Sequence, residues 1–321
     1  MDRLKKFEKS NVEKVLKDNF SKLMPTFYEM ESSFLAGVYK RYGDLEGGNI
    51  VIYFARDLHL EILRKRENDL SFDLSLDMFW QNHKDIRQGK KKIILVSQET
   101  GLPKETTRRK IISLIKKKHL KKEDKNRLFW EPASEHRETY LKIIGEQINS
   151  LSKFILEQTK LLQLNVPLVK IEREIKKNYS FYWYHYLTVQ LQYIKFWQEK
   201  LNDLEMLLIG LQTIIQTVHY MNKKSENGYL SQKIHKNMSM KDANISATSV
   251  SEVTGIPRAT CIRKLDKFVK MKILDKDEQS KRYFLKLNQS TLNPLLEGDW
   301  FKQKVSILSD FSSVVMKGLF R

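Results

Sequence analysis

The chain has 321 residues, and its 41% apolar content is enough to build packed cores for two domains of ordinary size. Its 58 lysines and arginines exceed its 39 aspartates and glutamates, and the resulting net charge of +19 favours an anionic partner, nucleic acid before anionic lipid. A single cysteine excludes an internal disulfide, and with no secretory signal or membrane-length apolar run we expect a cytoplasmic protein without membrane contact.

Only 12 glycines and 6 prolines occur, which predicts a largely helical chain with few turns. The first helices precede an acidic pair, Asp44 and Glu46, and the same pair recurs as Asp203 and Glu205. Because each pair lies near an expected helix start, we interpret these carboxylates as helix caps that complement the helix dipole.

Residues 96–110, VSQETGLPKETTRRK, align without gaps on residues 250–264, VSEVTGIPRATCIRK. Weaker similarities link residues 16–20 with 175–179, 44–46 with 203–205, and 151–154 with 308–311. This pattern predicts a fused tandem duplication, with one copy in residues 1–165 and the other in residues 166–321. In each copy we expect N-terminal helices, a central block and a C-terminal helix.

Each central block predicts two short helices joined by a tight turn. In the second copy we expect Val250 and Val253 to face inward on the first helix, with Thr248 or Ser249 as its cap. Gly255 supplies the positive φ of a helix end, and the proline that follows suits the start of the next helix.

The second helix of each block has one apolar and one polar face. The apolar positions are Ile111, Leu114 and Ile115 in the first copy, and Cys261, Leu265 and Phe268, with Ile262 and Val269, in the second. Residues 120–129 and 274–287 then each predict two short strands around a polar turn that carries cations.

The turn sequences TGLPKET and TGIPRAT resemble those of the winged helix-turn-helix superfamily of bacterial regulators, in which such a turn leads into the recognition helix. The order of helices around each block also resembles that of MarR-like regulators, whose terminal helices build a dimer interface. The resemblance implies a mainly α fold with two winged helix-turn-helix units, at about residues 88–132 and 240–288. Each would have a small β-hairpin wing, and long helices over residues 135–164 and 171–220 would join the copies with pseudo-two-fold symmetry.

The outward faces of both blocks predict contacts with double-stranded DNA. The predicted DNA-binding residues are Lys104, Glu105, Thr106, Arg108, Arg109, Lys110, Ser113, Lys125 and Arg127 in the first copy, and Arg258, Thr260, Arg263, Lys264, Lys267, Lys281 and Arg282 in the second. The resemblance implies groove contacts from Lys104, Thr106, Arg109, Arg258, Thr260 and Arg263. Arg108 departs from the pattern because the second copy has Ile262 there, so either the first helix packs less fully or Arg108 reaches a phosphate.

Other chemistries have weaker support. The aromatic run at residues 179–186 suits core packing better than base stacking, since aromatic residues recur at helical spacing. The seven histidines are scattered and no nucleotide-binding or hydrolase motif occurs, so we expect no metal site, no cofactor and no enzymatic activity. A redox role for Cys261 is disfavoured because Thr107 has the aligned position.

These observations favour a transcriptional regulator that binds specific DNA sites, is associated with the nucleoid and uses two recognition helices per chain. A plasmid- or phage-type replication initiator with two winged helices is the first alternative, and a non-DNA scaffold or ribosome-associated protein is the second. One chain would then do the work of a dimer, although a further homodimer through the flanking helices stays open. No small-molecule effector is specified.

Overall fold

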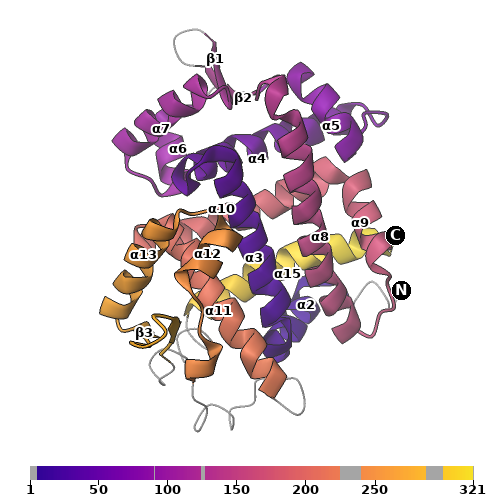
Figure 1. Cartoon of the computed structure of the whole chain (residues 1–321). Coiled ribbons are helices and arrows are strands. Elements are labelled where there is room, and N and C mark those ends of the chain that lie inside the picture. The colour runs from indigo at the N-terminus through magenta and orange to yellow at the C-terminus, as the bar shows by residue number, and fades with distance from the viewer. Residues whose placement is uncertain (1–5, 90, 124–126, 225–239, 287–298, 321) are drawn as a thin grey trace.

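The computed structural model describes residues 6–89, 91–123, 127–224, 240–286 and 299–320. Helices dominate this part of the chain, and the strands form two small antiparallel hairpins (Figure 1). The expectation of a mainly α protein is therefore confirmed. None of the described helices is long and apolar enough to cross a membrane.

The elements of the two halves follow one another in a similar order. The first half contains α2 (Lys9–Asp18), α3 (Phe20–Tyr42), α4 (Leu45–Asn68), α5 (Leu76–Asn82), α6 (Ile93–Thr100), α7 (Lys104–Lys116), β1 (Leu120–Glu123), β2 (Arg127–Trp130) and α8 (Arg137–Leu161). The second half contains α9 (Leu168–Lys177), α10 (Tyr179–Leu201), α11 (Leu204–Lys224), α12 (Ala247–Thr254), α13 (Arg258–Lys270), β3 (Leu274–Lys276), β4 (Tyr283–Leu285) and α15 (Asp299–Leu319). Short 3-10 turns cover His83–Asp85, Ser134–His136 and Met240–Ala243.

Local sequence explains where the long helices begin and end. Asp44 accepts a hydrogen bond of 2.6 Å from the Gly47 amide at the start of α4, and Asp203 accepts one of 3.2 Å from Met206 in α11. The capping interpretation of both aspartates is thus confirmed. The expected long helix over residues 171–220 is wrong, because the chain breaks between α9 and α10 and again at Asn202, which has a left-handed φ of 51°.

A hydrophobic core runs through both halves of the chain. In it α3 packs against α8 and α11, α4 against α10, α2 against α15, and α8 against α9. The large aromatic residues of α3 and α10, including Phe27, Tyr179, Tyr186 and Tyr193, are buried in this core. The aromatic run at residues 179–186 therefore packs the interior, as the helical spacing predicted.

Two helix–hairpin units lie on this helical body. The first helix–hairpin unit comprises α6, α7, β1 and β2, and the second comprises α12, α13, β3 and β4. Leu120 pairs with Trp130 in one hairpin, and Leu274 pairs with Leu285 in the other. The first unit packs on α4 and α10 and the second on α11 and α3, so long helices from both halves support each unit (Figure 1).

Candidate nucleic-acid interface

The two helix–hairpin units have the same turn between their helices. Gly101 and Gly255 end α6 and α12 with φ values of 71° and 73°, a region that favours glycine. Thr100 donates to the Val96 carbonyl, and at the aligned position Thr254 donates to Val250. Ser97 and Ser251 likewise donate to the Leu102 and Ile256 carbonyls. The prediction for Gly255 is confirmed.

Two expectations about α12 are wrong. Its cap is Ser246, which accepts a 3.0 Å hydrogen bond from the Ser249 amide, and not Thr248 or Ser249. Val253 does not face inward, because it is 57% exposed at the end of the helix. Val250 is fully buried as expected. The helix begins at Ala247, before both expected caps, and of the two valines only Val250 packs inward.

The inner faces of α7 and α13 pack as their apolar residues predict. Ile111 and Leu114 are buried in the first unit, and Leu265 and Phe268 in the second. Cys261 is fully buried and its thiol donates to the Ile256 carbonyl at 3.4 Å, while burial raises its pKa. A buried thiol with a raised pKa is poorly suited to redox chemistry, in line with the structural interpretation of Cys261.

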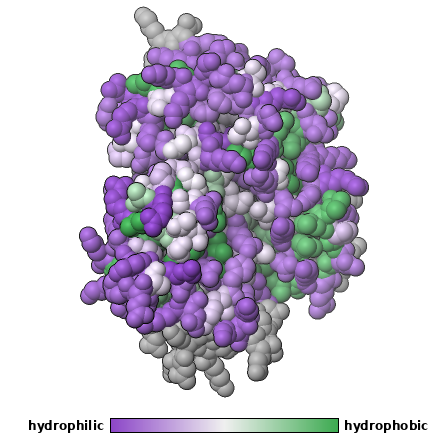
Figure 2. Space-filling view, viewed as in Figure 1, coloured by the Kyte–Doolittle hydropathy of each residue, from purple (hydrophilic) through white to green (hydrophobic). Residues whose placement is uncertain are grey.

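The aligned arginines Arg109 and Arg263 are exposed on the outer faces of α7 and α13. Other predicted contact residues that are exposed on these helices are Lys104, Glu105, Arg108, Ser113, Arg258 and Lys267, and Thr106 and Thr260 are half-buried. Arg258 donates to the Thr248 hydroxyl at 3.0 Å, which orients its guanidinium along the outer side of the turn. Figure 2 shows mainly hydrophilic residues over the first unit and a mixture of hydrophilic and apolar residues over the second.

Arg108 does not pack inward, and it forms an ion pair on the surface of α7. Its guanidinium lies 2.8 Å from the Glu105 carboxylate, one turn earlier on α7, and both side chains are well exposed. The hydrogen bond to Arg108 lowers the pKa of Glu105. The first unit therefore presents a local ion pair where the second presents Ala259 and the half-buried Ile262.

Two predicted DNA contacts, Lys110 and Lys264, are placed differently by the structure. Lys264 is 8% exposed, and its ammonium lies 2.6 Å from Asp203 and 2.9 Å from Glu205. At the aligned position Lys110 is half-buried, 2.8 Å from Asp44 and 3.1 Å from Glu46. Neither ammonium is on the outer face, so both leave the set of candidate DNA contacts.

These two ion-pair clusters lie together. Asp44, Glu46 and Lys110 line the same pocket of about 250 Å³ as Asp203, Glu205 and Lys264. Burial disfavours a charged Lys110, but hydrogen bonds and charge from Asp44 and Glu46 raise its pKa overall. The clusters join each second helix to the start of α4 or α11, and they fix both units relative to the helical body.

The hairpin turns carry the remaining predicted cations. Lys125 lies outside the described residues. Arg127 is half-buried and donates to the Gln88 carbonyl at 3.3 Å, whereas Lys281 and Arg282 are exposed. Lys281 pairs with Glu278 at 2.9 Å, and Arg282 donates to Asn244 at 3.1 Å. The turn in the second unit thus offers two accessible cations held by local contacts.

Sequence reasoning missed two further aligned cations. Lys116 and Lys270 are exposed near the ends of α7 and α13, on the same helices as the arginines. Their recurrence at aligned positions could have identified them. The pairing of Lys110 and Lys264 with the acidic residues could have been found in the same way, because all three residues recur together in both copies.

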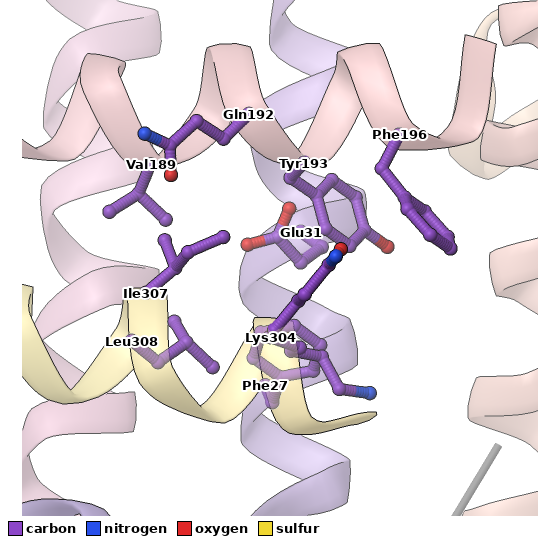
Figure 3. Close-up of a pocket in the computed structure, with 10 residues that line it drawn as sticks. Phe27, Glu31, Val189, Gln192, Tyr193, Phe196, Lys304, Ile307 and Leu308 are labelled. Carbon is purple, nitrogen blue, oxygen red and sulfur yellow. The ribbon is translucent and has the colours of Figure 1, made fainter. Parts of the chain in front are cut away.

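A second polar cluster lies in the helical core (Figure 3). Burial raises the pKa of Glu31 to about 8, and one of its oxygens accepts a 2.9 Å hydrogen bond from Gln190. Burial lowers the pKa of Lys304 to about 7, and its ammonium lies 4.4 Å from the centre of the Phe20 ring. The cavity beside them measures only about 30 Å³, room for about one water molecule.

Among the described residues, no group of three or more His, Cys, Asp or Glu side chains is arranged to hold a metal ion. No protein-family model matches the sequence, and neither curated proteins nor solved structures provide a match. The features of the chain that bear on function are therefore the two helix–hairpin units, their exposed cations and the contacts that hold them.

Proposed function

We propose that the chain is a transcriptional regulator that binds specific double-stranded DNA sites through two winged helix-turn-helix units produced by tandem duplication. In this proposal α7 and α13 are recognition helices that enter major grooves, and the hairpins are wings that contact phosphates. The observation that carries it is the recurrence of one exposed arginine, Arg109 or Arg263, at the same position of each second helix.

The duplication is supported by agreement between elements well beyond the aligned block. The helices α3 and α10 both have 23 residues, and α7 and α13 both have 13. The turn hydrogen bonds and the lysine-carboxylate clusters also recur at aligned positions. Agreement in helix length, backbone contacts and ion pairs is hard to obtain by chance, which favours descent from one repeated unit.

DNA recognition is supported by what the outer faces offer. An arginine guanidinium can bind guanine O6 and N7 together, which contributes about 1–3 kcal/mol of discrimination. Exposed lysines on the same helices, Lys104, Lys116, Lys267 and Lys270, suit phosphate contacts. Because the ion-pair clusters hold both units on one body, a single chain would present two recognition helices at fixed spacing, as a two-fold dimer does.

The proposal is tested by selecting bound duplexes from a random library and measuring their affinity. Arg109→Ala and Arg263→Ala should each weaken binding to the selected site, by about tenfold or more. Lys153→Ala, which removes an exposed cation from α8, is the matched control and should leave sequence preference unchanged. Failure to enrich any sequence, or equal effects of all three variants, would contradict specific recognition. A footprint over direct repeats at an origin would instead indicate a replication initiator.

A further inference from the structure

A groove of about 840 Å³ lies between α3, α8, α11 and the end of α12. Thr254 and Gly255 form one of its edges, so the groove reaches the turn that precedes α13. Its volume falls within the range of about 300–1,000 Å³ that is typical of small-molecule sites. The groove is therefore large enough for a ligand and adjoins a proposed DNA-binding unit.

The two halves of the chain differ at this place. With α3 and α10 aligned from end to end, Ser33, Ala36 and Gly37 of α3 match Gln192, Lys195 and Phe196 of α10. A Cβ at Gly37 would lie 2.7 Å from the Ile143 side chain, so a glycine here permits the close approach of α8. Because Gly37 has no side chain, it takes up no space in the groove. The small side chains of α3 leave open space on this side.

Larger side chains stand at the matching positions in the other half. Gln192 and Phe196 line the cavity of about 30 Å³ shown in Figure 3, where both are labelled on α10. The side chain of Lys195 lies against Gly101, within 3.5 Å of where its Cβ would be, at the end of α6. The side chains at these positions thus differ in size between the groove and the matching region beside the first unit.

The groove is lined by more acidic than basic side chains, whereas the whole chain is basic. Glu29, Glu146 and Glu252 line it together with one lysine, Lys40, although the chain has a net charge of +19. Glu29 is 2.7 Å from His219, while Glu146 and Glu252 are exposed. Such a rim attracts a cation and repels an anion.

The groove also has apolar walls and a satisfied polar base. Ala36, Ile215 and Val253 supply apolar surface, and the exposure of Val253 is explained by its position at the groove edge. At the base Gln212 donates a 2.8 Å hydrogen bond to the Ser32 hydroxyl, and both residues are buried. Apolar walls below a carboxylate rim suit a ligand with a compact apolar body and a positive charge.

We propose that this groove binds a small organic ammonium ion, and that occupancy acts on the second helix–hairpin unit through Thr254 and Gly255. The ammonium lies among the carboxylates of Glu146 and Glu252, and the apolar part contacts Ala36 and Val253. The binding step stands without DNA, whereas the effect on α13 rests on the proposed function. One site per chain follows from the difference between α3 and α10.

The test is calorimetric titration of the DNA-free full chain with tryptamine, with indole-3-propionate as an anionic probe of similar shape. Tryptamine should bind saturably at one site, and indole-3-propionate should not. Ala36→Lys, which places the residue of the second half in the groove, should weaken tryptamine binding at least about tenfold. The double variant Glu146→Gln, Glu252→Gln should do the same without adding bulk. Lys195→Ala, on the opposite side, should leave binding unchanged.

Circular dichroism melting establishes that each variant is folded. If Ala36→Lys does not fold, the Glu146→Gln, Glu252→Gln double variant tests the site alone. Absence of saturable tryptamine binding, equal binding of both probes, or insensitivity to the folded variants overturns the site. Repeating the DNA titration with tryptamine separates the two proposals. A chain that binds tryptamine but no DNA sequence retains the site and loses the proposed function, while unchanged DNA affinity overturns the action on α13.

Discussion

The ammonium of Lys264 on α13 lies 2.6 Å from the carboxylate of Asp203, the residue that caps α11. Asp203 thus stabilises the start of a core helix and also holds the second recognition helix of the proposed DNA-binding surface. In the first half Asp44 and Lys110 have the same relationship at 2.8 Å. The two contacts differ in burial, because Lys264 is buried and Lys110 is half-buried.

This difference predicts unequal costs of removing the two aspartates. Asp203→Ala should lower the free energy of unfolding by about 3 kcal/mol, since it leaves a buried ammonium with one carboxylate and removes a cap. Asp44→Ala should cost less, because water reaches Lys110 and screens its charge. Urea unfolding of both variants measures the two losses in free energy of unfolding. A larger loss for Asp44→Ala than for Asp203→Ala would show that burial of the lysine does not determine the size of the loss.

The sequence predicted the features that depend on residues close together in the chain, and it did not predict those that depend on contacts between distant residues. The turn at Gly255 and the buried Val250 follow from residues a few positions apart, and both were predicted correctly. The inward position of Lys264 was not predicted, because its partners Asp203 and Glu205 are distant in sequence and helical periodicity places a lysine outside. The groove beside α3 was also missed, since it depends on packing between four helices.

Salt dependence should distinguish phosphate contacts from base contacts. If the cationic hairpins and helices displace condensed counterions, affinity for duplex DNA should fall by orders of magnitude between about 50 and 200 mM salt. Lys281→Ala, at the tip of the exposed second hairpin, should weaken binding to all sequences about equally and reduce the salt slope by about one. Fluorescence anisotropy titrations measure both, and a flat salt response would count against phosphate binding.

The buried pair in the core should make stability depend on pH in two opposite ways. Glu31 has a folded-state pKa raised to about 8, so its protonated form is favoured by folding, and stability should fall as pH rises from about 5 to 8. Lys304 has a pKa lowered to about 7, so its neutral form is favoured, and stability should rise as pH increases from about 7 to 10.

Two variants separate these contributions in urea unfolding across that pH range. Glu31→Gln should abolish the fall on the acidic side, and Lys304→Met should abolish the rise on the basic side. Each slope should be at most about 1.4 kcal/mol per pH unit. Identical pH profiles for the wild type and both variants would mean that neither group titrates in the folded core within this range.

The ion pair between Glu105 and Arg108 predicts an effect on target symmetry. Glu105→Ala places on α7 the residue that α13 has at Ala259, removes a charge that repels phosphate and releases Arg108 for DNA contact. We expect tighter DNA binding and a selected site with more similar halves. Arg108→Ala is the matched control because it removes the same ion pair without adding a free cation. Weaker binding by Glu105→Ala would assign Glu105 a direct base contact.

Base-by-base substitution of the selected DNA site, with the Arg109→Ala and Arg263→Ala variants, tests the central proposal most directly. Because Arg109 and Arg263 are each exposed on a different proposed recognition helix, we expect the site to be an imperfect inverted repeat. Arg109→Ala should relax base preference in one half-site, and Arg263→Ala in the other, each by about 1–3 kcal/mol. A loss spread evenly over both half-sites from either variant would contradict the assignment of these helix faces to the grooves.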